Sequence, residues 1–366
     1  MSTIQDVARH AAVSVSTVSN VLNGRTDRMR GDTLARVQAA IAALQFRPNN
    51  LARRLKTGHT PLIGLLVPSI ANPMYGYIAR EIETHAQERH GYRVLTGNTY
   101  RDKVKEDAFF QDLLAHGVRR VIVISSLADE GHFEMAVRRG MAVVSYDRRA
   151  TPGSKTGVDH ITPDNFEAAR LATEHLIAHG HTRLAFATVA GMTMSRSAKI
   201  AGFQAAAERV GAQGRVLDGG PLHEYGDSVI SEVGRALGLR IAGQARRPTG
   251  IVAVNDLMAL GLMAGLREGG LQVPRDVSVV GMDGLHLSSL SNPGLTTVQL
   301  PIPEMARAMV ESVISREPGA GAAASERVFT PTLLIERESV GPAPATAAKA
   351  AAGRGARQTK QTRIRA

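Results

Sequence analysis

Six apolar residues in a row, Leu62-Ile63-Gly64-Leu65-Leu66-Val67, decide the fold class of this chain. An unbroken run of this kind is typical of a strand that is buried on both faces of a parallel sheet. Residues 74–90 follow with apolar side chains at helical spacing, among them Ile78 and Ile82. A strand followed by a helix is the repeating unit of doubly wound α/β proteins, so the sequence predicts that architecture.

The alternation of strand and helix continues as far as residue 280. A loop around Pro152 and Gly153 divides it into two sets of similar length. Two sets predict two α/β lobes, and ligands of such folds bind beyond the carboxyl ends of the strands. The further strands are expected at 92–95, 121–125, 142–146, 184–188, 215–217, 251–254 and 277–280, and the further helices at 102–116, 130–139, 166–179, 197–210, 227–242 and 256–268.

The residues before this core predict three short helices. Thr3 and Asp6 have the spacing of a capping box, and Ser14 is placed to cap a helix over residues 15–22. Asp32 is placed to cap a longer third helix. The turn between the first two helices must be tight, and it sets the second helix steeply across the first. This helix-turn-helix arrangement presents its second helix to the major groove of DNA, whereas a small helical domain without that role is the alternative.

Positive charge gathers at both ends of the chain. The 366 residues include 44 Lys and Arg against 33 Asp and Glu, a net charge of +11. Residues 1–60 carry nine basic and three acidic side chains, and residues 341–366 carry six basic and no acidic ones. Basic ends around a near-neutral middle predict a polyanionic partner, with nucleic acid as the first candidate. Residues 341–366 are rich in Ala, Pro and Gly and are predicted to be a disordered tail. This tail either has no specific role or adds a sequence-independent contact to DNA.

Several classes of protein are excluded by what the sequence lacks. Without cysteine there is no disulfide framework, thiolate metal site or cysteine nucleophile. The first residues do not resemble a signal peptide, and the longest apolar stretch, 251–266, is too short to span a membrane, so a cytoplasmic location is expected. Motifs for dinucleotides, P-loops and serine hydrolases are missing, and His85, Glu88 and His90 lack metal-ligand spacing. We therefore expect no enzyme, no cofactor and no metal site.

Short motifs occur in a fixed order from residue 3 to about residue 340. They include residues 3–8, 13–23, 46–49, 63–68, 72–75, 146–148, 164–165, 255–261, 281–284 and 295–298. Their combination closely resembles the LacI (lactose repressor) family of bacterial transcription regulators. The resemblance implies a helix-turn-helix DNA-binding domain over residues 1–47, a hinge helix and linker over 48–60, and a two-lobed effector-binding and dimerisation domain of the periplasmic-binding-protein type I over 61–340, before the disordered basic tail over 341–366.

For the helix-turn-helix domain at residues 1–47, called the head below, the resemblance implies that side chains of the second helix face base edges. Asn20 can pair with adenine, Ser16 with several bases, and Val15 can pack on a thymine methyl group, although a core role for Val15 is the alternative. Thr17 and Ser19 would instead contact phosphates. Ala12 departs from the family, which often has Gly or Asn in the turn. The residues of the head assigned to DNA are Thr3, Ser14, Val15, Ser16, Thr17, Ser19 and Asn20.

Residues 49–56 resemble the hinge helix of the family, which folds on operator DNA as two copies meet in the minor groove. Leu55 matches the leucine that wedges between central base pairs and bends the duplex. Small side chains let the paired hinges approach closely, and basic ones neutralise phosphates. An ordinary charged linker is the alternative. The hinge residues assigned to DNA are Asn49, Ala52, Arg53, Leu55 and Lys56.

Polar residues that follow the predicted strands match positions that line the ligand cleft in this family. Carboxylates, amides and an Arg fork hydrogen-bond vicinal hydroxyls, so the resemblance implies a carbohydrate effector. Structural hydrogen bonds at strand ends are the alternative, above all for Asp164 and Asp256. Met74, Pro221 and Lys199 depart from the family pattern and leave a modified sugar, a weaker site or a charged ligand open. The residues assigned to the effector are Asn72, Met74, Tyr75, Asp147, Arg148, Lys199, Pro221, Asn255, Asp283 and Gln299.

The resemblance predicts a homodimeric regulator, most often a repressor, that binds a near-palindromic operator in double-stranded DNA. An effector between the two lobes would shift the population of DNA-binding states. The alternative is a corepressed or activating regulator that responds to a sugar acid, a sugar phosphate or a non-sugar metabolite. Residues 341–366 have no counterpart of the family's leucine-rich tetramer-forming tail, so we expect a dimer.

Overall fold

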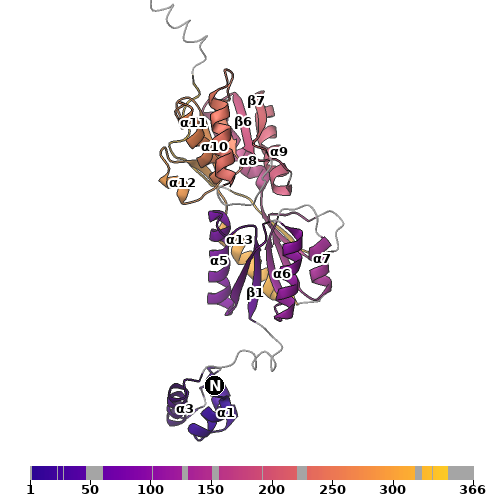
Figure 1. Cartoon of the computed structure of the whole chain (residues 1–366), viewed down its shortest axis with the longest axis vertical. Coiled ribbons are helices and arrows are strands. Elements are labelled where there is room, and N and C mark those ends of the chain that lie inside the picture. The colour runs from indigo at the N-terminus through magenta and orange to yellow at the C-terminus, as the bar shows by residue number, and fades with distance from the viewer. Residues whose placement is uncertain are drawn as a thin grey trace, which may run out of the picture. The chain divides into compact units, whose positions relative to one another are not determined.

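The computed structural model describes eleven stretches of the chain, which form two compact units (Figure 1). One unit comprises residues 1–60 and the other residues 61–366. Each unit has a hydrophobic core of its own. The described residues are 2–22, 24–27, 29–46, 61–100, 102–125, 131–150, 156–191, 193–220, 229–317, 324–331 and 333–344.

The first unit is a three-helix head. Its helices are α1 (Ile4–His10), α2 (Val15–Leu22) and α3 (Gly31–Ala43). They pack around fully buried Val7, Val18 and Val37, one from each helix. The helix-turn-helix predicted from the sequence is confirmed.

Two of the three predicted helix caps are confirmed. Thr3 and Asp6 form a reciprocal capping box, in which the Asp6 amide donates to the Thr3 hydroxyl and the Thr3 amide donates to the Asp6 carboxylate. The Ser14 hydroxyl accepts from the Thr17 amide at 3.2 Å and so caps α2. The cap assigned to Asp32 is wrong, because α3 begins one residue earlier and Asp32 lies in its first turn. There its carboxylate lies in the positive end of the helix dipole but accepts no capping hydrogen bond.

The first lobe of the second unit is a parallel sheet of six strands, in the order β11-β5-β4-β3-β1-β2. Helices α5 and α13 cover one face, and α6 and α7 cover the other (Figure 1). The strands are β1 (Leu62–Val67), β2 (Arg93–Asn98), β3 (Arg120–Ile124), β4 (Ala142–Tyr146), β5 (Asp159–Pro163) and β11 (Glu326–Phe329), and the helices are α5 (Pro73–His90), α6 (Lys103–Ala115), α7 (Gly131–Arg138) and α13 (Ile302–Ser315).

The second lobe repeats this plan with the strand order β12-β10-β9-β8-β6-β7. All neighbouring strands are parallel except β10 and β12, which are antiparallel. Helices α8 and α9 pack on one face, and α10 and α11 on the other. The strands are β6 (Arg183–Thr188), β7 (Gln213–Asp218), β8 (Gly250–Ala253), β9 (Ser278–Asp283), β10 (Thr296–Gln299) and β12 (Leu333–Ile335), and the helices are α8 (Asn165–Ala178), α9 (Met194–Arg209), α10 (Val229–Ala242), α11 (Asp256–Glu268) and α12 (Leu287–Leu290).

The chain passes from one lobe to the other after β5, after β10 and after β11. Helix α13 therefore returns to the first lobe, where it packs on α5, and β11 extends the first sheet beside β5. The two predicted α/β lobes are confirmed, but each is discontinuous in sequence. The sequence pattern predicts no strand at residues 159–163 and no element beyond residue 280, whereas the structure has β5, β10, β11, β12, α12 and α13 there.

The end of the described chain is bonded to the second lobe. The Gly341 amide donates to the Ser278 hydroxyl at 3.1 Å, and the Ala343 amide donates to the His179 carbonyl at 2.9 Å. The expectation of a disordered tail from Gly341 is therefore wrong for residues 341–344, and residues 345–366 lie outside the described residues. Among the described residues, no helix combines the length and apolar character that a membrane span requires.

Candidate functional site

Helix α2 presents the predicted base-reading side chains to solvent. Val15 is 42% exposed, and Ser16 and Asn20, four residues apart on one face, are exposed as well. Val18, by contrast, is fully buried against the other helices of the head. The alternative that Val15 belongs to the core is therefore excluded, and one face of α2 is open for contact.

Hydroxyl groups gather at the first turn of α2. The Ser14 hydroxyl lies 2.7 Å from that of Ser16 and 2.8 Å from that of Thr17. This first turn contains no acidic residue, so its amide groups and hydroxyls face no carboxylate of their own helix. Such an end suits a phosphate oxygen. Thr3, by contrast, already donates its hydroxyl hydrogen to Asp6, at 2.7 Å.

The turn between α1 and α2 depends on a left-handed residue that is not glycine. Ala12 has φ +51°, and the next amide, of Val13, donates back to the Ala8 carbonyl at 3.0 Å. This is the position where the family often has Gly or Asn. A left-handed alanine is strained because its Cβ crowds the backbone.

We expect Ala12→Gly to stabilise the head by about 1 kcal/mol, because glycine removes this strain. Amide hydrogen exchange of α1 and α2 in the full chain would measure the gain. The matched control is Ala11→Gly at the neighbouring position, where φ is −80° and the side chain is buried, and which should instead destabilise the head. Equal protection in the two variants would contradict the prediction.

In the second unit, the predicted ligand residues follow strand ends as expected. Asn72 follows β1, Asp147 follows β4, Asn255 follows β8, and Asp283 and Gln299 end β9 and β10. The two asparagines also begin helices. The Asn72 side-chain oxygen accepts from the Met74 amide at 3.0 Å, and that of Asn255 accepts from the Met258 amide at 2.9 Å. Among the described residues their NH2 groups make no bond and can donate to a ligand.

Asp283 is the most perturbed carboxyl group of this set. Burial raises its pKa well above the usual value, and the nearby charges of Asp256 and Asp147 raise it further, whereas Lys199 opposes the shift. Burial also raises the pKa of Tyr146, and the charges of Asp147 and Asp283 add to that rise. Residues of the two lobes, Tyr146 and Asp147 from the first and Asp283 and Lys199 from the second, therefore lie close together. Clustered perturbed groups of this kind are typical of functional sites.

Asn165, which was not assigned to the site, fixes Asp147. Its side-chain nitrogen donates to the Asp147 carboxylate at 3.1 Å and to the Pro163 carbonyl at 3.4 Å. Asp147 itself has a left-handed backbone, with φ +64°. Asn165 begins α8, where the chain enters the second lobe, so it links the crossover to the site. Its place in the 164–165 motif was the only signal in the sequence.

Three of the residues assigned to the effector are largely buried. Arg148 is 0% exposed, and its guanidinium carbon lies 5.7 Å from the centre of the Phe133 ring on α7. Its guanidinium therefore packs against an aromatic ring of the first lobe, and its assignment to the effector stays a prediction. Met74 is also part of a hydrophobic core. Lys199 is 9% exposed and donates to the Val254 carbonyl at 2.9 Å, so its charge is partly satisfied.

The structural alternative is confirmed for Asp164 and Asp256. Asp164 caps α8 by accepting from the Glu167 amide at 3.0 Å. The buried Asp256 carboxylate accepts from the Ser288 hydroxyl at 2.6 Å, the Thr297 hydroxyl at 2.5 Å and the Leu285 amide at 2.9 Å. Its backbone amide donates to the Asp283 carboxylate at 3.4 Å. Asp256 thus fixes the segment that follows Asp283 at the end of β9.

Several assigned residues lie outside the described residues. They are Asn49, Ala52, Arg53, Leu55 and Lys56 of the predicted hinge, and Pro221 of the predicted ligand site. Across the described part of the chain, no group of three or more His, Asp or Glu side chains has a geometry that could hold a metal ion.

Two family descriptions match the chain. Residues 3–49 match the bacterial regulatory proteins of the lacI family, and residues 173–340 match the periplasmic binding protein-like domain. The HTH-type transcriptional regulator reg1 of Streptomyces lividans is 34% identical over 347 residues, which cover 93% of this chain and 97% of that protein. The regulator GalR of Escherichia coli K12 is 30% identical over 345 residues, which cover 93% and 96%.

Solved structures of the same kind are also similar. The lac repressor dimer bound to operator and the anti-inducer ONPF matches with a TM-score of 0.77 and 25% identity, over 93% of this chain and 99% of that one. A complex of the regulator CelR with cellobiose matches with a TM-score of 0.65 and 25% identity, over 93% and 100%. The similarity therefore extends over both units.

Proposed function

Because this chain belongs to the LacI family of bacterial transcription regulators, we propose that it binds operator DNA through α2 and that a neutral carbohydrate in its core controls this binding. One observation carries the proposal. The same chain has an exposed face on α2 in its first unit and, in its second unit, buried polar groups from two lobes that lie close together. The protein would act in the cytoplasm, where its DNA target is, and without catalysis.

The DNA-binding part of the proposal rests on the chemistry of α2. Asn20 would read adenine and Ser16 a neighbouring base, while the hydroxyls of Ser14 and Thr17 would hold phosphates. Residues 48–60 would form the hinge in the minor groove. Two heads of a homodimer would occupy the two halves of a near-palindromic operator. The similar lac repressor was solved as a dimer bound to operator.

The charge around Asp283 favours a neutral, hydroxylated effector over an anionic one. Two carboxyl groups, of Asp147 and Asp283, lie near each other, whereas the ammonium of Lys199 donates to a backbone carbonyl. Hydroxyls of a sugar donate to carboxylates and accept from the asparagine NH2 groups, while a phosphate or carboxylate would be repelled. The related CelR binds cellobiose, a neutral sugar.

A ligand that touches both lobes would change the balance between two arrangements of the core and hence the affinity for DNA. We propose relief of repression as the response. Corepression or activation would require the opposite preference of the ligand for the two arrangements.

A screen of thermal unfolding with pentoses, hexoses, disaccharides, sugar acids and sugar phosphates would identify the effector class, because a ligand of the folded state raises its stability. Stabilisation by anionic sugars alone would refute the neutral class.

Asn20→Ala should weaken specific operator binding by about 1–3 kcal/mol, or about 5- to 150-fold, because it removes a base contact. Affinity for non-specific DNA should stay unchanged. Fluorescence anisotropy with operator and scrambled duplexes measures both. The control is Gln38→Ala, which truncates another exposed amide of the head, on α3. An equal loss on both duplexes would show that Asn20 contacts only the phosphate backbone.

A further inference from the structure

Five arginines lie where four strands of the second lobe begin. The strands β7, β6, β8 and β9 are neighbours in the sheet and run in parallel, so they start at the same end of the lobe. The proposed effector residues lie at the opposite ends of β8 and β9. We call these five residues the basic face: Arg183 at the start of β6, Arg215 in β7, Arg246 and Arg247 before β8, and Arg275 before β9.

Contacts bring the arginines of the basic face together. The Arg183 Nε atom donates to the Arg247 carbonyl at 3.2 Å. Arg215 donates to the side-chain oxygen of Gln244 at 2.6 Å, two residues before Arg246. The start of β6, the edge strand β7 and the segment before β8 therefore adjoin one another.

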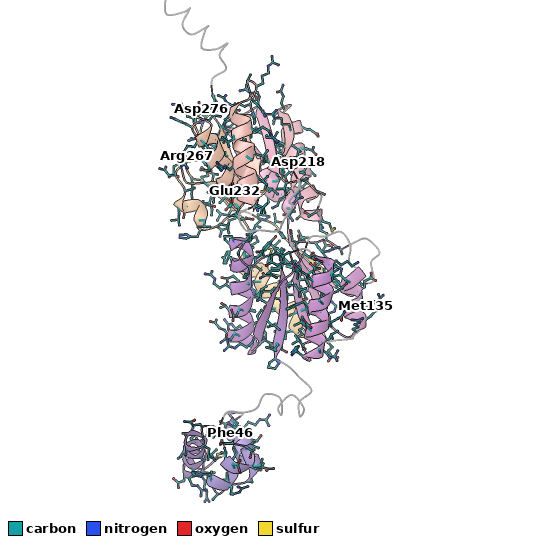
Figure 2. The ribbon with its side chains drawn as sticks, viewed as in Figure 1. Phe46, Met135, Asp218, Glu232, Arg267 and Asp276 are labelled. Carbon is teal, nitrogen blue, oxygen red and sulfur yellow. The ribbon has the colours of Figure 1, made fainter. Side chains whose placement is uncertain are left out.

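Asp276, labelled in Figure 2, is a carboxylate within this group. The Gln272 amide donates to it at 2.8 Å, and the Arg275 guanidinium lies 3.4 Å away. The amide bond lowers the pKa of Asp276 most, and the charges of Arg275 and Arg247 lower it further. Asp276 therefore lies near both arginines and connects the segments before β8 and β9.

The basic face carries more positive charge than its own contacts neutralise. Across the described part of the chain, Arg275 pairs with Asp276, whereas the other four arginines form no ion pair. Arg215, Arg246 and Arg275 are exposed to solvent. A helix carboxyl end carries only about half a negative charge, so the ends of α10 and α11 do not balance these arginines. Residues 61–340 together are close to neutral, so the excess of charge is local.

The end of the described chain runs beside the basic face. A Cβ atom on Gly341 would lie 3.1 Å from Cγ of Pro274, the residue before Arg275. The bonds of Gly341 and Ala343 to the second lobe fix the chain at this point. Residues 345–366 follow in the sequence with six basic and no acidic side chains. The sequence thus adds positive charge directly after a point that is fixed beside the face.

We propose that the basic face binds a second segment of double-stranded DNA through its phosphates, without sequence preference. The planar guanidinium group holds a phosphate with two parallel hydrogen bonds, and clustered cations displace the counterions of DNA. The face leaves the proposed effector residues free, because those lie at the opposite ends of the strands. It belongs to the second unit, whereas α2 belongs to the first. A dimer bound to DNA through its heads would therefore hold another duplex as well.

The test measures bridging of two short duplexes of random sequence by the full-length protein. One duplex is immobilised, the protein is added, and capture of a second, fluorescent duplex is measured at low salt. The double variant Arg246→Glu and Arg247→Glu should capture at least about tenfold less of the second duplex, because it replaces attraction of phosphates by repulsion. The slope of log affinity against log salt should also flatten by about two. Unchanged capture would overturn the proposal, since the two heads of the dimer would then hold both duplexes.

The matched control reverses another adjacent pair of exposed arginines. Arg138→Glu and Arg139→Glu make the same change of charge at the end of α7 in the first lobe. This control should capture the second duplex within about twofold of wild type, since exposed charges act weakly over distance. Equal losses in the two double variants would refute a specific face. If the variant of the basic face fails to fold, Arg215→Glu alone should still lower capture by at least about threefold.

Two further outcomes would overturn the proposal. Deletion of residues 345–366 would assign the second duplex to that segment if it abolished capture while the variant of Arg246 and Arg247 retained it. Polyglutamate is the second competitor. If it displaced the second duplex as effectively as an unlabelled duplex of equal charge, the face would fit an acidic peptide and not DNA.

Discussion

Replacing Asp283 by asparagine should abolish the response to effector and leave operator binding by the unliganded protein intact. The carboxyl group is buried beside Asp147 and Lys199, where it can accept from ligand hydroxyls of a bound sugar. Asparagine replaces one carboxyl oxygen with an NH2 group, to which a ligand hydroxyl cannot donate. A buried group left without its partner costs about 1–3 kcal/mol, so effector affinity should fall about 5- to 150-fold. Titration of an operator complex with the effector, followed by fluorescence anisotropy, would measure both affinities.

The control for this variant is Glu208→Gln, the same change from acid to amide at an exposed position of α9 in the same lobe. It should release operator at wild-type effector concentrations. If Asp283→Asn also released operator at those concentrations, Asp283 would not belong to the effector site.

The same substitution should raise stability in a way that depends on pH. Burial and the neighbouring Asp256 raise the pKa of Asp283 above its value in the unfolded chain. The folded state therefore holds this proton more tightly, and the stabilisation it brings is present in acid and lost as pH rises through the raised pKa. Asparagine does not ionise, so Asp283→Asn should unfold at a higher temperature than wild type near neutral pH. The difference should shrink below about pH 4, where both forms are neutral. A difference that is constant with pH would contradict this account.

Replacing Gly261 by alanine should have the largest effect on stability. A Cβ atom at this position would lie 2.0 Å from the Ser231 carbonyl oxygen, which belongs to the backbone of α10. Gly265, one turn further along α11, would likewise meet the Arg235 carbonyl at 2.0 Å. The two helices therefore pack backbone against backbone, and a methyl group must push them apart. Overpacking of this kind costs about 3 kcal/mol or more, which lowers the unfolding midpoint by about 5–10 °C.

Thermal unfolding of the full chain would test this prediction. Gly243→Ala provides the control, because it adds the same methyl group just after α10, where the nearest atom is the Arg240 carbonyl oxygen at 3.8 Å. Its midpoint should stay close to that of wild type. Equal midpoints for the two variants would show that α10 and α11 can separate at little cost.

Local features of this protein follow from the sequence alone. The apolar run at 62–67, the capping box of Thr3 with Asp6 and the exposed face of α2 depend on residues within a few positions of one another. Side-chain periodicity and backbone capping act over that range, so the α/β class, the helix-turn-helix and the strand-end positions of the ligand residues could be predicted.

The tertiary structure decided which distant residues meet. Helix α13 returns to the first lobe, β11 pairs with β5, and Asn165 holds Asp147, and these contacts join segments whose separation leaves no local pattern. Arg148 is a further case, since nothing in the sequence beside Asp147 predicted that its guanidinium would pack on Phe133. The burial and the direction of a side chain depend on contacts with residues that are distant in the sequence. Local periodicity carries no information about those contacts.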